Sequence, residues 1–131
     1  MAFGTYNKGS RAEHELMKKL EEHGFLVIRA AGSGKGSPCP DILAFKRTEQ
    51  FGFECKAVNN TSLQLRKEQV KQLKIWQELS GITTYIAWRL PGGEWRFVRP
   101  EHLHENPKSY AISLEEAKKI GVKFEEMIFV I

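Results

Sequence analysis

Three chemically active residues stand close together in the pattern Pro40-Asp41 followed by Glu54-Cys55-Lys56. Glu54 and Lys56 lie in an apolar run that reads as a strand, so their side chains project from one face of it. Burying such charges is costly unless they are paired or bind a metal. A short hairpin would bring Asp41 beside Glu54, and two carboxylates placed in this way suit Mg²⁺. The pattern therefore predicts a Mg²⁺ site.

Lys56 extends this chemistry toward phosphate esters. A bound divalent ion lowers the pKa of water and neutralises charge that builds up at a reacting phosphate. The Lys56 ammonium group would orient or help to deprotonate that water, or stabilise the charge directly. The alternative is a structural ion pair between Glu54 and Lys56 on an exposed strand face, and the motif alone does not choose between them.

Glu13 is a candidate third acid. It shares a helical face with Leu16, Met17 and Leu20, the stripe that should pack against the sheet. A carboxylate on that stripe would point toward the other two acids. The competing interpretation is a capping box, in which Glu13 follows Ser10 by three residues and caps the start of a helix.

The elements that must position these residues follow from apolar periodicity and from turn residues. Helices are expected from Ser10 to Gly24, over residues 63–79 after a cap within Asn59–Ser62, and from Ser113 to Gly121. Strands are expected at 25–28 (mostly buried), 41–45, 50–58, 82–90 and 94–98, with a hairpin turn at Lys46–Glu49 and a glycine-rich loop at 31–38. This order predicts an α/β fold with a mixed central sheet flanked by helices.

Composition and charge limit the classes of protein to which this chain can belong. The 131 residues, 41% of them hydrophobic and 27% charged, fit one globular domain. No apolar run is long enough to cross a membrane, and the N-terminal residues lack the apolar block and cleavage site of a signal peptide, so an intracellular, cytoplasmic protein is expected. Cys39 and Cys55 are expected to be reduced thiols. The net charge of +4, concentrated before residue 101, is compatible with nucleic-acid binding without establishing it.

The acidic pattern resembles the PD-(D/E)xK nuclease superfamily. A closer resemblance, over residues 7–98, is to the archaeal-type Holliday junction resolvases of the Hjc family. The segments that carry it are Lys8 to Leu16, His23-Gly24-Phe25, Val27 to Gly34, Lys56, Thr61-Ser62-Leu63, Ala87-Trp88-Arg89 and Trp95-Arg96-Phe97.

The resemblance implies a restriction-endonuclease-like fold in a single domain over residues 1–131, with 101–131 as an acidic extension of that domain. It implies a homodimer that cuts opposed strands of a four-way DNA junction, with Mg²⁺ as cofactor and Mn²⁺ as a substitute. The implied catalytic residues are Glu13, Ser33, Asp41, Glu54 and Lys56, of which Glu13, Asp41 and Glu54 bind the metal. One departure is His14, where the family commonly has Arg, which implies a weaker or pH-dependent phosphate contact.

Basic side chains supply the expected DNA contacts. The resemblance assigns Arg29 to DNA beside the active site, and Lys67, Lys71 and Lys74 form a stripe on the predicted 63–79 helix that suits phosphates. An ordinary solvated face explains that stripe equally well. The other predicted contacts are Lys8, Arg11, Lys35 and Arg89. Val70, Leu73 and Trp76 on the same helix belong either to the core or to a dimer face.

Two rival functions stay open at this point. One is another PD-(D/E)xK nuclease that cuts flaps, nicks or duplex DNA, and the other is a non-catalytic DNA-binding module with the same fold. Nucleotide binding is rejected because Gly34-Lys35-Gly36-Ser37 lacks the phosphate-loop order. His102 and His104 are expected at the surface, and Trp88 and Trp95 in the core.

Overall fold

A five-stranded mixed sheet forms the centre of the computed structural model, which describes residues 3–30 and 39–129, with side chains from residue 10 onward. The strand order is β1-β2-β3-β5-β6. Only β3 and β5 run parallel, and every other neighbouring pair is antiparallel. The strands are β1 (Leu26–Arg29), β2 (Ile42–Lys46), β3 (Glu49–Lys56), β5 (Thr83–Arg89) and β6 (Trp95–Val98). The predicted mixed sheet is thus confirmed.

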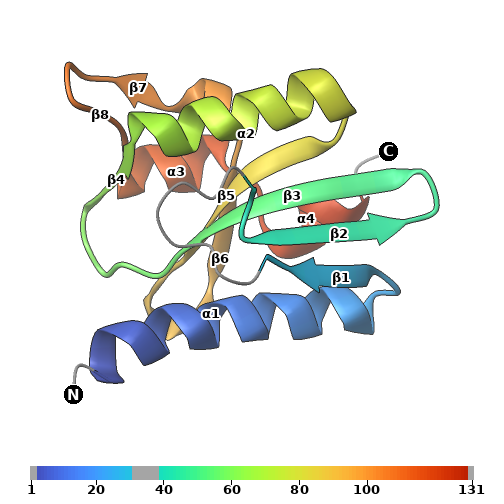
Figure 1. The fold of residues 1–131 in the computed structure, drawn as a ribbon. Coiled ribbons are helices and arrows are strands. Elements are labelled where there is room, and N and C mark those ends of the chain that lie inside the picture. The colour runs from blue at the N-terminus through green and yellow to red at the C-terminus, as the bar shows by residue number, and fades with distance from the viewer. Residues whose placement is uncertain (1–2, 31–38, 130–131) are drawn as a thin grey trace.

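Helices cover both sides of this sheet, with α1 and α2 on opposite sides (Figure 1). They are α1 (Phe3–Glu22), α2 (Lys67–Ser80), α3 (Leu114–Ile120) and α4 (Phe124–Phe129), with short 3-10 turns η1 (Pro91–Gly93) and η2 (Pro100–His102). No helix within the described ranges is long and apolar enough to span a membrane.

Two separate hydrophobic cores result. Leu16 and Leu20 of α1 pack with Phe53 of β3 and Met127 of α4 in the first core. The second core joins α2 to α3 and contains, among others, Leu63, Val70, Leu73, Ile86, Trp88 and Ala117. Because side chains alternate along a strand, the consecutive residues Ile86 and Ala87 of β5 enter different cores.

A small second sheet was not predicted. It has the order β4-β8-β7, with β4 at Ser62–Arg66, β7 at His104–Glu105 and β8 at Ser109–Ser113. The expected start of the second helix at residue 63 is therefore wrong, and α2 begins at Lys67. Leu63 and Leu65 are buried while Gln64 and Arg66 are exposed, an alternation of period two that favours a strand.

Two other expectations fail at the first core. Strand β1 is an edge strand on which Leu26 and Ile28 are 77% and 54% exposed, so the expectation of a mostly buried strand is wrong. Helix α1 begins at Phe3, which places Ser10 inside the helix. Ser10 therefore cannot be the cap that a capping box requires, and that interpretation of Glu13 is wrong.

Several local predictions are confirmed. The hairpin between β2 and β3 turns at Arg47, which adopts a left-handed φ of 54°. Helix α3 begins after Ser113, whose hydroxyl group accepts a hydrogen bond from the Glu116 N–H, and Gly121 ends it. Trp88 and Trp95 are buried, as predicted.

Candidate metal centre

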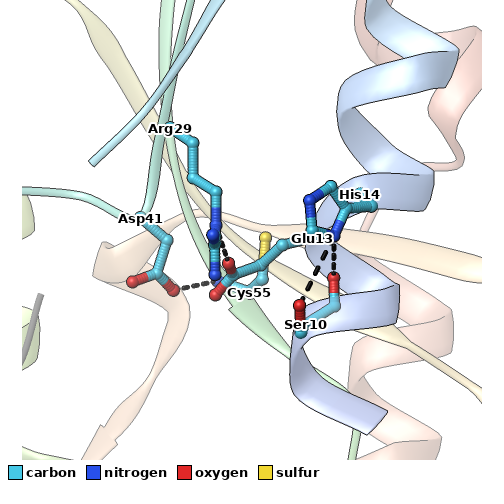
Figure 2. Close-up of polar contacts among 6 residues, drawn as sticks. All are labelled: Ser10, Glu13, His14, Arg29, Asp41 and Cys55. Atoms are coloured by element: carbon cyan, nitrogen blue, oxygen red, sulfur yellow. Dashed lines mark hydrogen bonds and ion pairs between the residues drawn. The ribbon is translucent and has the colours of Figure 1, made fainter. Parts of the chain in front are cut away.

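The β2–β3 hairpin places Asp41 beside Glu54. Ile42 pairs with Phe53 in antiparallel register, so Asp41 lies next to this pair on one strand and Glu54 on the other. Asp41 is further fixed because its Oδ2 accepts a hydrogen bond from the Cys55 backbone N–H at 3.0 Å (Figure 2). The two carboxyl groups interact, since the Asp41 charge contributes to the raised pKa of Glu54. The motif residues thus form one acidic pair.

Burial and neighbouring charge favour protonation of this pair. The pKa of Glu54 rises from 4.5 to about 8, chiefly because of burial and next because of the Asp41 charge, while the Lys56 charge opposes the rise. The pKa of Asp41 is also raised, chiefly by burial, although the Cys55 N–H stabilises its charged form. Near neutral pH the pair therefore retains a proton that a cation would have to displace.

Glu13 approaches the pair from α1 but is held by a different partner. Its Oε1 lies 2.7 Å from Nε of Arg29, at the end of β1 (Figure 2). The Glu13 charge nevertheless contributes to the raised pKa of both Asp41 and Glu54, which places the three acids in one electrostatic site. The inward direction expected for Glu13 is observed, and its immediate partner is a guanidinium group.

Gln69, a residue that the sequence interpretation missed, also touches the acidic pair. Its Nε2 donates a hydrogen bond to Glu54 Oε2 at 3.0 Å from the first turn of α2. A single glutamine is neither a usual metal ligand nor a nucleophile, so its residue type gave no signal. The predicted helix also began at residue 63, four residues before the observed start at Lys67. The packing of α2 against β5, the parallel neighbour of β3, brings this amide to the site.

The donors at this site suit a hard divalent cation. Asp41 and Glu54 present carboxylate oxygens, the ligand type that Mg²⁺ and Mn²⁺ prefer, and the charges of Asp41 and Glu13 both raise the pKa of Glu54, so a cation at this position would offset their repulsion. Throughout residues 3–30 and 39–129, no three His, Cys, Asp or Glu side chains stand ready to hold an ion together. The assignment of Glu13 as a third ligand therefore stays a prediction.

Several predicted DNA contacts have intramolecular partners. Arg89 Nε lies 2.9 Å from Oε1 of Glu15, whose Oε2 accepts a hydrogen bond from Trp95 Nε1 at 2.8 Å. Lys67 lies 3.1 Å from Glu105. These contacts tie α1 to β5 and β6, and α2 to the second sheet, so Arg89 and Lys67 have structural roles as well.

The other residues predicted to contact DNA or to act near the cleaved bond lie in different parts of the chain. Lys71 and Arg11 are exposed, and Lys74 lies over the Tyr110 ring at 5.3 Å from its centroid. The side chain of Lys8, on α1, and residues Ser33 and Lys35 lie outside the part of the chain that is described.

Other sequence expectations concern the surface and the thiols. The His14 Nδ1 lies 2.8 Å from the Ser10 carbonyl oxygen, so the ring contacts its own helix (Figure 2). His102 and His104 are exposed, as expected. Cys39 and Cys55 are free thiols, and burial raises the pKa of both.

Comparison with known proteins gives consistent matches over nearly the whole chain. The profile of the family described as "Archaeal holliday junction resolvase (hjc)" matches residues 4–131. The crossover junction endodeoxyribonuclease Hjc of Methanocaldococcus jannaschii is 40% identical over 123 residues, which cover 94% of this chain and 88% of that protein. The protein of the same name from Archaeoglobus fulgidus is 34% identical over 128 residues, covering 92% and 94%.

The fold matches as well. The solved structure of Archaeoglobus fulgidus Hjc, described as a Holliday junction resolvase from an archaeal hyperthermophile, superposes with a TM-score of 0.81 at 32% identity. The match covers 92% of this chain and 94% of that one. The resemblance drawn from the sequence motifs and the restriction-endonuclease-like α/β fold expected from it are both confirmed.

Proposed function

The chain belongs to the archaeal Holliday junction resolvase family, and from that premise we propose that it is an endonuclease that cuts four-way DNA junctions symmetrically. The observation that carries this proposal is the Asp41–Glu54 pair, which the antiparallel register places side by side on adjacent strands, with the Glu13 charge raising the pKa of both. Placing two acids side by side is costly for the fold, because burial and neighbouring charge disfavour their ionised forms. A role as metal ligands accounts for that cost.

Nucleases of this family type depend on a divalent metal, and we assign Mg²⁺ here, with Mn²⁺ able to substitute. Asp41 and Glu54 would bind it, with Glu13 joining them once it leaves Arg29. The bound cation would supply positive charge beside the scissile phosphate and make water a better nucleophile. Hard oxygen ligands and the local excess of negative charge support the choice of ion.

Lys56 is the positive group that belongs to the chain itself. It follows Glu54 by two residues on β3, and its charge favours the ionised forms of both Glu54 and Asp41. We assign it to the phosphate oxygens, where an ammonium group stabilises the negative charge that develops during hydrolysis. Ser33 is proposed to act nearby, on the family resemblance alone.

DNA would be held by backbone contacts around this site. Arg29 lies at the end of β1, within contact of Glu13, and is assigned to a phosphate next to the cleaved bond. We retain Lys8, Arg11, Lys35 and the stripe Lys67, Lys71 and Lys74 as phosphate contacts, with Arg89 as the weakest candidate because Glu15 already neutralises it. Recognition would then read junction shape more than base sequence.

Symmetric cutting needs two copies of the site, and we propose a homodimer. Four exposed apolar side chains supply a candidate contact: Leu26 and Ile28 on β1, and Ile75 and Leu79 on α2, which are 42% and 82% exposed. Exposed apolar side chains make each of these two elements a candidate for the contact between copies. Leu79→Glu should convert a dimer to a monomer in light scattering, whereas unchanged mass would exclude α2 as that contact.

We also propose that residues 1–131 act as one nuclease domain inside the cell, where junction DNA is found. The C-terminal segment supports this proposal because Phe124, Met127 and Ile128 of α4 belong to the same core as α1. The C-terminal segment therefore packs as part of the same domain.

Labelled DNA substrates test the proposed function. The parent protein should cut a four-way junction into paired nicked duplexes with Mg²⁺ and be inactive with a chelator. Linear duplex, nicked and flap substrates of the same sequence serve as controls. Equal cutting of junction and duplex would favour a different nuclease of the superfamily, and binding without any cleavage would favour a non-catalytic module.

A further inference from the structure

Both ends of the Gln69 side-chain amide are used. Oε1 accepts a hydrogen bond from the Arg66 backbone N–H at 3.1 Å, and Nε2 donates to Glu54 Oε2 at 3.0 Å. A backbone N–H can only donate, so the amide oxygen must face Arg66 and the amino group must face Glu54. The start of α2 thereby fixes which end of Gln69 meets the acidic pair.

Helix α2 is a firm support for this contact. Val70 and Leu73, in the turn of the helix that follows Gln69, are buried in the core. Lys67, at the start of the helix, forms an ion pair with Glu105 of the second sheet. Strand β4, which leads into α2, pairs along its whole length with β8. The second sheet holds no acid of the site, yet through α2 it fixes the amide that contacts Glu54.

We propose that Gln69 is a positioning residue that holds the Glu54 carboxyl group in place for the divalent cation. The amide has no charge in the working pH range, so it directs one oxygen of Glu54 without competing for the cation. On its other side, the β2–β3 register places Asp41 next to Glu54. Second-shell hydrogen bonds of this kind orient metal ligands, and their loss typically weakens metal affinity roughly 10- to 100-fold.

The inference rests on the proposed function and is tested with Gln69→Met, which keeps the length of the side chain and removes both polar ends. Cation affinity is measured by calorimetric titration of the protein with Mn²⁺, and junction cleavage by titration with Mg²⁺. We expect Mn²⁺ affinity to fall about tenfold and the Mg²⁺ concentration for half-maximal cleavage to rise about tenfold. The rate at saturating Mg²⁺ should stay within about twofold of the parent.

Ser113→Ala is the matched control. Gln69→Met also removes an acceptor at the start of α2, and Ser113→Ala removes the acceptor for the Glu116 N–H at the start of α3, outside the acidic site. Both variants should lose a similar amount of thermal stability. Only Gln69→Met should change cation affinity, because the control leaves Glu54 untouched.

The outcomes separate the two proposals. If the parent protein cuts junctions with Mg²⁺ and Gln69→Met binds Mn²⁺ as tightly as the parent, the positioning role is wrong and the proposed function stands. Equal weakening in Ser113→Ala would also overturn it, since general loss of stability would then be the cause. If the parent protein fails to cut junctions with either cation, the proposed function itself is wrong.

Discussion

The acids on the strands and the acid on the helix are neutralised in opposite ways. Asp41 and Glu54 sit opposite each other in a hairpin and have raised pKa values that favour protonation, while Glu13 on α1 pairs with the Arg29 guanidinium group at 2.7 Å. The strand pair cannot separate without breaking the β2–β3 register. Glu13 can leave its ion pair with Arg29 by a side-chain movement that leaves the strand pairing unchanged. The strands therefore hold the permanent part of the site, and the helix supplies a part that can exchange partners.

Removing a strand acid should reduce junction cleavage more than any other change proposed for the site. Asp41→Asn keeps the size of the side chain but removes a cation ligand, so junction cleavage should fall at least about a thousandfold, roughly 4 kcal/mol in activation free energy. Junction binding without cation should be unchanged, because the basic residues are intact. Gel-shift and single-turnover cleavage assays measure the two properties, and cleavage close to the parent rate would contradict the assignment.

Glu13→Gln should have a smaller effect. If Glu13 binds the cation only after its ion pair with Arg29 breaks, it is a weaker ligand than the strand acids. Its loss should therefore reduce cleavage by about 10- to 100-fold. The double variant with Asp41→Asn should be no worse than Asp41→Asn alone, since both act at one site. A loss as large as that of Asp41→Asn would mean that the helix acid is as essential as the strand pair.

The sequence predicted the strand acids better than the helix acid for a physical reason. Asp41 and Glu54 are joined by a short hairpin, and antiparallel pairing over a few residues fixes which side chains meet. The Glu13–Arg29 contact joins α1 to β1, and the Glu54–Gln69 contact joins β3 to α2. Both contacts therefore depend on how the two helices pack against the sheet. No spacing along the chain encodes that docking.

The second sheet escaped prediction for a related reason. Strand β4 is five residues long and pairs with β8, which follows it by more than forty residues. Its alternation between Leu63 and Leu65 covers too few residues to outweigh the helical pattern that follows. Asn59 to Ser62 was equally suited to capping a helix, which shifted the predicted start to residue 63.

The proton held by the strand pair should make stability depend on pH. Glu54 has a folded pKa of about 8 against an ordinary 4.5, so between these values the folded state binds more protons than the unfolded state. Stability therefore decreases as pH rises through this window, by at most about 1.4 kcal/mol per pH unit for one proton. Urea unfolding in chelator at pH 5.5 and pH 7.5 measures the decrease.

Glu54→Gln provides the control for that experiment, because an amide cannot titrate. Its stability should change less between the same two pH values, and Mg²⁺ should reduce the decrease in the parent protein. Identical pH profiles for the parent and Glu54→Gln would show that the strand pair is ionised independently of folding.

The smallest expected effect concerns the rest of α1. Glu15 contacts Arg89 and Trp95, which are not part of the acidic pair, so Glu15→Gln should cost about 1 kcal/mol of stability through the weakened ion pair. The cation concentration for half-maximal cleavage should not change. An altered cation dependence would show that the position of α1, more than the charge of Glu13, controls the site.

The most direct test is the number of protons released when the cation binds. Calorimetric titration of the protein with Mn²⁺ at pH 7, in buffers of different ionisation enthalpy, counts them. Displacement of the proton held by the Asp41–Glu54 pair predicts close to one proton released per ion in the parent and close to none in Glu54→Gln. Tight binding with no proton released by the parent would contradict a buried, protonated pair as the cation site.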